Sequence, residues 1–169
     1  MKTQYHWDLY REIIKYSTKY GKQQNSSWTI ISDEQTFIVM GNLRKILLTF
    51  GDSQQSLILG RTFSKRNLLS YLFPWNIYKT ILPEAGIVFS RKALEDMTND
   101  KCFGWLSPRA TERALVQCGS LMNVQLIDPI DKNQSFYWYS DEALSFGNLN
   151  YRGHRVLDFT ITRIKVFGY

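Results

Sequence analysis

The side chains best suited to specific recognition are grouped on one predicted helix, residues 108–123 (PRATERALVQCGSLMN). The face opposite its apolar positions carries Arg109, Thr111, Arg113 and Gln117. Guanidinium and carboxamide groups form paired hydrogen bonds with guanine and adenine edges in the major groove of DNA. The alternative interpretation is a solvated polar face, and the acidic Glu112 among these residues does not favour a phosphate-binding surface.

A second basic group lies near the end of the chain, in a predicted hairpin at about residues 152–167. It contains Arg152, His154, Arg155, Arg163 and Lys165. Such a hairpin is suited to following a nucleic-acid backbone or entering a minor groove. Solvated surface charges are again the alternative. The start of the 108–123 helix, behind Ser107 and Pro108, adds free amide groups that favour a phosphate.

Four consecutive aromatic residues, FYWY at 136–139, allow three interpretations. They are a stacking platform for single-stranded nucleic acid, a protein-docking patch, or a strand that buries alternate rings in the core. The sequence leaves all three open.

The remaining reactive side chains do not form a recognisable catalytic or metal pattern. Cys102 and Cys118 lack metal-ligand spacing and are expected to be reduced core thiols, a redox switch requiring that the fold bring them together. His6 and His154 are too isolated for a metal site. The acid pairs Asp33-Glu34 and Asp141-Glu142 fall in predicted turns. We therefore expect no enzyme and no cofactor, although a nuclease built on scattered acids and lysines leaves little local signature.

Length and charge set the class of protein and of partner. The 169 residues predict one domain, and 21 Lys and Arg against 15 Asp and Glu give a net charge of +6. This excess favours nucleic acid or an acidic membrane surface. The longest apolar runs are far shorter than the ~20 residues that span a bilayer. Charged residues interrupt the first segment where a signal peptide is apolar, so we expect a soluble, cytoplasmic protein.

The first half of the chain predicts one helix followed by four strands. Apolar residues recur every three or four positions over residues 1–20, Gly21 ends the helix, and residues 22–27 form a polar linker. This helix either packs on its own domain or serves as an association arm. Residues 28–32, 36–40, 46–50 and 56–59 are short, apolar and separated by turn residues, which predicts a four-stranded antiparallel meander.

Three further helices are predicted in the centre. Ser64 is expected to cap one that buries Leu68, Leu69 and Leu72. Ser90 is expected to cap a second, with Ala93, Leu94 and Met97 facing inward. Ser107 and Pro108 begin the third, which is expected to bury Ala110, Ala114, Cys118, Leu121 and Met122. Extended patterns return at 124–127, 135–139 and 156–167.

Several of these segments resemble the winged-helix DNA-binding domains of the OmpR/ToxR type. The segment GIVFSRKAL at 86–94 is similar to the family signature that opens its second helix, and Trp105 is placed like a tryptophan that commonly follows. The segment SPRATERALVQCGSLM resembles the recognition helix, and the closing ITRIKVFGY resembles the last strand. The resemblance covers residues 28–127 and 156–169 and leaves 128–155 as an insertion.

The resemblance implies an α+β winged helix. It has an N-terminal four-stranded antiparallel sheet, a three-helix centre and a C-terminal β-hairpin wing. An extra helix, residues 1–21, precedes a DNA-binding domain at 28–169. The implied function is sequence-specific binding of double-stranded DNA by a bacterial transcriptional regulator, with RNA polymerase or a second regulator as partner and a homodimer formed through residues 1–20. The alternatives are a non-catalytic interaction protein of the phage or secretion-system type and a single-strand or RNA-binding module.

Overall fold

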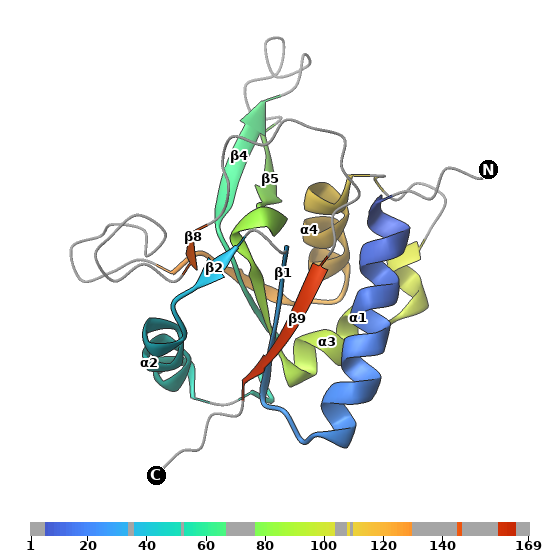
Figure 1. Ribbon diagram of the computed structural model, residues 1–169. Coiled ribbons are helices and arrows are strands. Elements are labelled where there is room, and N and C mark those ends of the chain that lie inside the picture. The colour runs from blue at the N-terminus through green and yellow to red at the C-terminus, as the bar shows by residue number, and fades with distance from the viewer. Residues whose placement is uncertain are drawn as a thin grey trace.

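Helices and short strands alternate along the chain in the computed structural model, which describes residues 6–33, 36–51, 53–66, 77–103, 108, 110–129, 145–146 and 159–164 (Figure 1). In order, the elements are α1 (His6–Gln23), β1 (Trp28–Asp33), β2 (Phe37–Ile38), α2 (Met40–Phe50), β3 (Leu57–Leu59), β4 (Thr62–Arg66), β5 (Ile77–Ile81), η2 (Pro83–Ala85), β6 (Ile87–Ser90), α3 (Arg91–Met97), η3 (Asp100–Phe103), α4 (Thr111–Leu121), β7 (Gln125–Ile127), β8 (Ser145–Phe146) and β9 (Phe159–Ile164). This mixture of helices and strands agrees with the expected α+β class.

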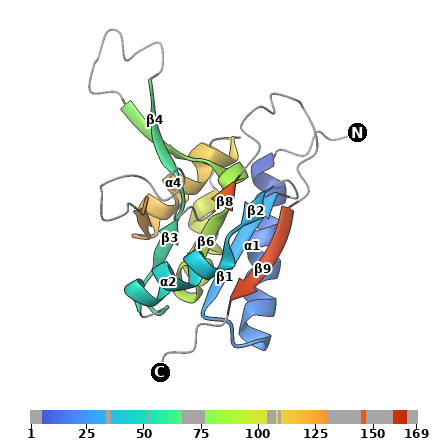
Figure 2. The same ribbon diagram turned by 60° about the vertical axis from the view of Figure 1, so that its left-hand side comes forward.

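A five-stranded mixed sheet forms the centre, in the order β7-β3-β6-β1-β9. β6 is antiparallel to both of its neighbours, β1 and β3, and β7 is parallel to β3. The strands β1, β3 and β7 therefore run in one direction, and β6 and β9 run in the other. Two smaller antiparallel pairs, β2 with β8 and β4 with β5, lie outside this sheet (Figure 2).

Helices cover both faces of the central sheet (Figure 1). On one face, strand residues such as Ile31, Ile58 and Phe89 belong to a buried cluster shared with α1, α3 and α4. On the other face, Trp28, Ile30, Leu57, Leu59 and Val88 pack with Leu43, Ile46 and Leu47 of α2. Adjacent residues of β1, β3 and β6 point to opposite faces. Burial on both faces accounts for the uninterrupted apolar runs LIL and IVF and for the run WTII, in which Thr29 is buried as well.

The predicted four-stranded meander is wrong, because the strands that follow one another in sequence do not pair. β1 lies between β6 and β9, and β2 pairs with β8. The closing segment ITRI is a strand as predicted, but it pairs with β1 along six residues of the central sheet. Residues 152–158, from which its hairpin partner was expected, lie outside the described residues.

The strand predicted at 46–50 is also wrong, because Met40–Phe50 is the helix α2. Leu43, Ile46 and Leu47 are buried at spacings of three and one, which is the period of a helix face. Gly41 and Asn42, expected in a turn, lie in its first turn, and Gly51 follows its last residue with a φ of 66°. A short apolar run does not distinguish a buried strand from a buried helix segment.

The first helix forms where the sequence predicted a helix, and it packs into the core. α1 buries Trp7, Tyr10, Ile14 and Ser17 at helical spacing and contacts α3 and α4. This is the packing expected if the helix belongs to its own domain. It continues through the buried Gly21 to Gln23, so Gly21 does not end it as predicted. Within the described ranges, no helix has the length and apolarity needed to cross a membrane.

Two of the three central helices have different boundaries from those predicted. Ser64 lies in β4, which pairs with β5, so it caps no helix, and Leu68, Leu69 and Leu72 lie outside the described residues. α4 begins at Thr111 instead of Pro108. It buries Leu115 between Ala114 and Cys118, whereas Ala110 is exposed and Leu121 is 57% exposed. The buried face of α4 is thus rotated from the predicted one. It includes Leu115 and excludes Ala110 and Leu121.

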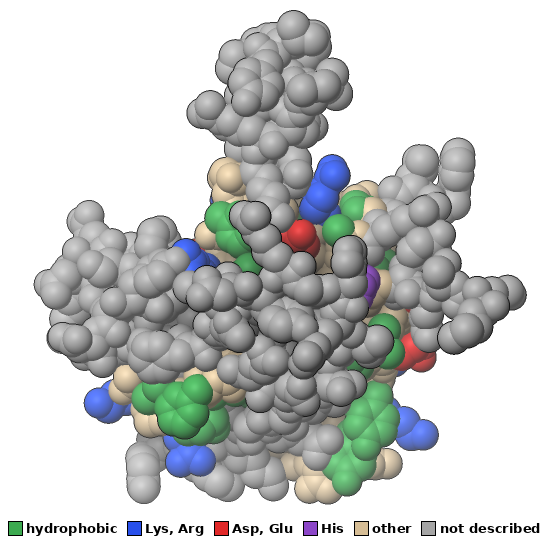
Figure 3. Space-filling model, turned by 45° about the horizontal axis from the view of Figure 1, so that its top comes forward, with side chains coloured by type: hydrophobic (Ala, Val, Ile, Leu, Met, Phe, Trp, Pro, Cys, Tyr) green, Lys and Arg blue, Asp and Glu red, His purple; other side chains and the backbone are tan. Residues whose placement is uncertain are grey.

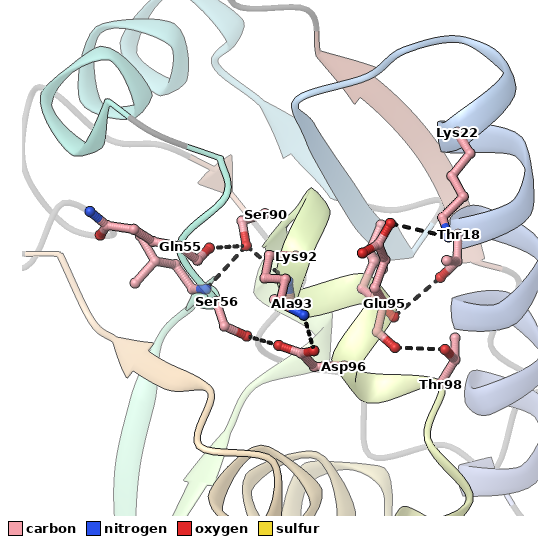
Figure 4. Close-up of polar contacts among 12 residues, drawn as sticks. Thr18, Lys22, Gln55, Ser56, Ser90, Lys92, Ala93, Glu95, Asp96 and Thr98 are labelled. Carbon is pink, nitrogen blue, oxygen red and sulfur yellow. Dashed lines mark hydrogen bonds and ion pairs between the residues drawn. The ribbon is translucent and has the colours of Figure 1, made fainter.

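Ser90 is the helix cap that the sequence predicted, and it also joins three segments (Figure 4). Its fully buried Oγ accepts hydrogen bonds from the amides of Ala93 and Leu57, at 3.1 Å each. The hydroxyl donates to the Gln55 carbonyl at 2.6 Å. A serine hydroxyl has one donor and two acceptor positions, and all three are used here.

Polar contacts beside Ser90 tie α3 to β3 and α1 (Figure 4). Ser56 Oγ donates to Asp96 at 2.7 Å, and the same carboxylate accepts from Lys92 at 2.7 Å. The hydrogen bond to Asp96, then its negative charge, raises the pKa of the exposed Lys92. Lys22 of α1 forms an ion pair with Glu95 at 3.2 Å.

The Ser90 contacts predict a measurable contrast between two buried serines. Ser90→Ala removes a helix cap and leaves two buried donors and one acceptor without a partner, so it should reduce the free energy of unfolding by ~1–3 kcal/mol. Ser17, equally buried in α1, has no hydrogen-bond partner for its Oγ among the described residues. Ser17→Ala should therefore be neutral or slightly stabilising. Chemical denaturation of both variants tests this, and an equal loss in both would contradict the assigned role of Ser90.

Candidate functional site

The predicted recognition helix presents only part of its expected polar face. Arg113 and Gln117, four residues apart, are exposed on α4, and they point away from the buried stripe. Thr111 is only 8% exposed, so the expectation that it lies on the exposed polar face is wrong, because the first turn of α4 packs into the core. Arg109 lies outside the described residues. Two side chains of the predicted site thus lie together on one surface.

The predicted basic hairpin is described at one position only. Arg163 lies in β9 with its Cα paired opposite Thr29 of β1. The other candidates of this region lie outside the described residues: Arg152, His154, Arg155, Lys165, the aromatics 136–139 and the pair Asp141-Glu142. On the face drawn in Figure 3, the Lys and Arg side chains of the described residues lie at separate places and do not form one patch.

A different group of residues meets at one edge of the central sheet. Because β1, β3 and β7 are parallel, their carboxyl ends lie at the same edge. Asp33 ends β1, Arg61 follows β3 after Gly60, and Asp128 follows β7. We call this edge, formed by residues 33, 60–62, 83–86 and 128, the carboxyl rim. In open α/β sheets, ligands bind outside the carboxyl ends of parallel strands.

Hydrogen bonds fix the rim between β3 and β7. Asp128 Oδ2 accepts from the Thr62 amide at 2.6 Å and from Thr62 Oγ1 at 3.1 Å. The Gly60 amide donates to the Ile127 carbonyl at 3.0 Å, and the Leu82 amide donates to the Arg61 carbonyl at 2.9 Å. Asp128 therefore holds the chain in place at its turn into β4. Its carboxylate accepts both hydrogen bonds from Thr62, and Asp33 and Arg61 are the charged residues that lie at the carboxyl ends of β1 and β3.

The middle of the rim is shaped by a glycine that needs its conformational freedom. η2 lies beside β1, and Gly86 leads from it into β6 with a φ of 83°. A Cβ atom at Gly86 would lie 3.4 Å from Ile30 Cδ1 and 3.5 Å from Ser32 Cβ. These are ordinary contact distances, so it is the positive φ, and not a lack of space, that favours glycine at this position. In the predicted signature GIVFSRKAL, this glycine is the first residue.

Arg91, also part of that signature, has a structural position. Its Nε donates to the Ser26 carbonyl at 2.9 Å, and a terminal nitrogen donates to Asn25 Oδ1 at 2.8 Å. Asn25 has a φ of 51°, in the turn that connects α1 to β1. Arg91 thus secures that turn against the start of α3.

The two cysteines are not the reduced thiols that the sequence predicted. Cys102 in η3 and Cys118 in α4 form a disulfide with their Cα atoms 4.9 Å apart. The sequence could not give this pairing, because the 16-residue separation leaves the distance between the cysteines open. His6, at the start of α1, is exposed. Across the described ranges, no three His, Cys, Asp or Glu side chains are placed to hold a metal ion.

Comparison with known proteins adds no assignment. No protein-family model matches this chain, and no curated protein matches it either. The candidate sites therefore depend on their geometry alone.

Sequence reasoning missed the carboxyl rim, although one signal for it was present. In the run WTII, Ile30 and Ile31 are apolar at adjacent positions, and the run leads through Ser32 directly into Asp33-Glu34. Continuous apolar strands are typical of parallel strands buried on both faces, whereas strands of a meander with one solvated face alternate. The acid pair was assigned to a hairpin turn because the strands were assumed to pair in sequence order.

The rim glycine gives a second prediction with a matched control. Gly86→Ala places a side chain in a left-handed conformation and against Ile30, which should cost ~1–2 kcal/mol of stability or more. Gly41 lies in α2 with open space around its Cα, so Gly41→Ala should stabilise by ~0.5–1 kcal/mol. Thermal unfolding of the two variants measures both effects. A stable Gly86→Ala protein would contradict the described rim backbone.

Proposed function

We propose that this chain binds a phosphate-bearing small molecule at the carboxyl rim. The observation that carries the proposal is the parallel arrangement of β1, β3 and β7, which brings Asp33 and Arg61 to one edge of the sheet. Helices cover both faces of the sheet, so a ligand cannot reach the strands from either face. The ends of the strands are the positions where a ligand can bind.

The residue types at the rim favour this ligand class. Guanidinium groups bind phosphate oxygens through paired hydrogen bonds, which suits Arg61 to an anionic group. Mg²⁺ is commonly held by one or two carboxylates together with substrate phosphates, and Asp33 supplies such a carboxylate. One strand, β6, separates β1 from β3, so about 10 Å lies between the two strand ends. That span suits a molecule of nucleotide size better than a single ion.

Ligand-dependent stabilisation tests the proposal. A panel of nucleoside mono- and diphosphates, each with and without Mg²⁺ or Mn²⁺, is added to the protein during thermal unfolding. A ligand present at 100 times its Kd should stabilise the fold by ~2.7 kcal/mol. Asp33→Asn and Arg61→Gln should each weaken that binding at least about tenfold, which corresponds to ~1.4 kcal/mol.

Two exposed residues that do not belong to the rim serve as controls. Asp100→Asn in η3 and Arg44→Gln in α2 change the same charges and should leave binding unchanged. The proposal fails if no member of the panel stabilises the protein. It also fails if Asp33→Asn and Arg61→Gln fold and bind like the wild-type chain.

Duplex DNA binding is the second candidate, favoured by the exposed pair Arg113 and Gln117 on α4 and by the net charge of +6. It corresponds to the winged-helix resemblance, in which α4 follows the Ser90-capped helix as the recognition helix and β9 belongs to the wing. RNA polymerase, a second regulator or a homodimer formed through residues 1–20 would be its partners. This candidate has less support than the rim proposal. β9, the expected wing strand, pairs with β1 in the central sheet, and β7 pairs with β3 in the same sheet.

Titration with random duplex DNA, single-stranded DNA and RNA at two salt concentrations tests this candidate. If it holds, duplex binding should weaken steeply with salt, with a log–log slope near −5 for about six neutralised phosphates. Arg113→Ala should cost ~1–3 kcal/mol on a specific site, and Arg44→Ala on α2 is its charge-matched control. Absence of duplex binding at about 50 mM salt would exclude it.

A further inference from the structure

The disulfide between Cys102 and Cys118 lies inside the principal core. The two cysteines are 3% and 2% exposed and belong to the cluster that α1, α3, α4 and the sheet share. Met97 Sδ lies 3.2 Å from Cys118 Sγ. Thiol–disulfide exchange requires access of the attacking thiolate to a sulfur atom. A disulfide enclosed in this way is protected in the folded protein, which makes it a structural cross-link and not a switch.

The cross-link secures a helix whose N-cap residue is an alanine. Ala110 stands at the N-cap of α4, and an alanine side chain has no oxygen atom that could accept a hydrogen bond from the first amides of the helix. The disulfide instead fixes α4 to η3, which follows α3 directly. Through this bond, the residues that connect α3 with α4 are closed into a loop in the unfolded chain as well. Closing this loop lowers the conformational entropy of the unfolded chain, which stabilises the folded state relative to it.

We infer that this protein folds in an oxidising compartment, where Cys102 and Cys118 are joined as the chain folds, and not in the reducing cytoplasm that the sequence predicted. Disulfides persist in secreted, luminal and periplasmic proteins and are rare in cytosolic ones. A cross-link buried in the core must form before or during packing. The inference is independent of the ligand at the carboxyl rim.

The oxidation needs a disulfide-bearing oxidant, and oxidised glutathione suffices. One cysteine thiolate attacks a glutathione sulfur, which forms a mixed disulfide and releases one glutathione thiolate. The second cysteine thiolate then attacks the cysteine sulfur of the mixed disulfide and releases the other glutathione. The protein loses two electrons and two protons, and one oxidised glutathione becomes two reduced ones.

Refolding under two redox conditions tests the inference. The denatured, reduced chain is diluted into reduced glutathione alone or into a mixture of reduced and oxidised glutathione. Free thiols are then alkylated in denaturant and counted by mass spectrometry. With oxidised glutathione we expect no alkylated cysteine and cooperative unfolding. With reduced glutathione alone we expect two alkylated cysteines and a folding equilibrium constant lower by about 100-fold, or no folding.

A double variant and a comparison of compartments complete the test. Cys102→Ser/Cys118→Ser should give the same result in both buffers. The wild-type chain directed to a bacterial periplasm should yield more soluble protein than the same chain kept in the cytosol, and the double variant should show no such gain. The inference is overturned if the wild-type chain folds with both thiols free and with an unchanged denaturation midpoint. Two alkylated cysteines after refolding with oxidised glutathione would overturn it equally.

Discussion

Burial of the central strands on both faces is the constraint on which the rest of this structure depends. β6 lies between β1 and β3, and its Ile87, Val88 and Phe89 point alternately to two separate cores. Such strands need a helical layer on each side, because an uncovered face would expose a row of large apolar side chains to water. α2 covers one face, and α1, α3 and α4 cover the other. The positions of all four helices follow from this requirement.

The two ends of the central strands have different roles in this arrangement, and we call each row of strand ends an edge. Trp28 pairs with Ser90 at the amino end of β1, where the Ser90 hydroxyl, Asp96 and Lys22 join β3, α3 and α1 through hydrogen bonds and an ion pair. That edge provides stability. At the opposite edge, Gly60 and Arg61 connect β3 to β4, and Gly86 leads from η2 into β6 with a positive φ. The carboxyl ends of β1, β3 and β7 lie there together, which is why we propose the ligand site at that edge.

The disulfide connects the stability of α4 with the environment in which the protein folds. α4 carries the exposed pair Arg113 and Gln117, and its position on the sheet depends on Leu115, Cys118 and the cross-link to η3. A structural disulfide fits poorly with a regulator of transcription in a reducing compartment.

The sequence by itself determined those helices, caps and strands that depend on residues close to one another in the chain. The period of α1, the cap at Ser90 with Ala93, Leu94 and Met97 buried behind it, and the strands at β1, β3, β7 and β9 all depend on residues close in sequence. Only the tertiary structure decided which strands pair, because β1 meets partners about 60 and 130 residues away, and no local pattern encodes that choice. The same holds for α2, because its apolar run suits a strand as well as a helix. The segment is a helix in the structure, where it covers one face of the central sheet. It also holds for Cys102 and Cys118, which the packing of η3 against α4 brings together. Asp33 was expected in a turn, and the sheet topology places it at the carboxyl rim.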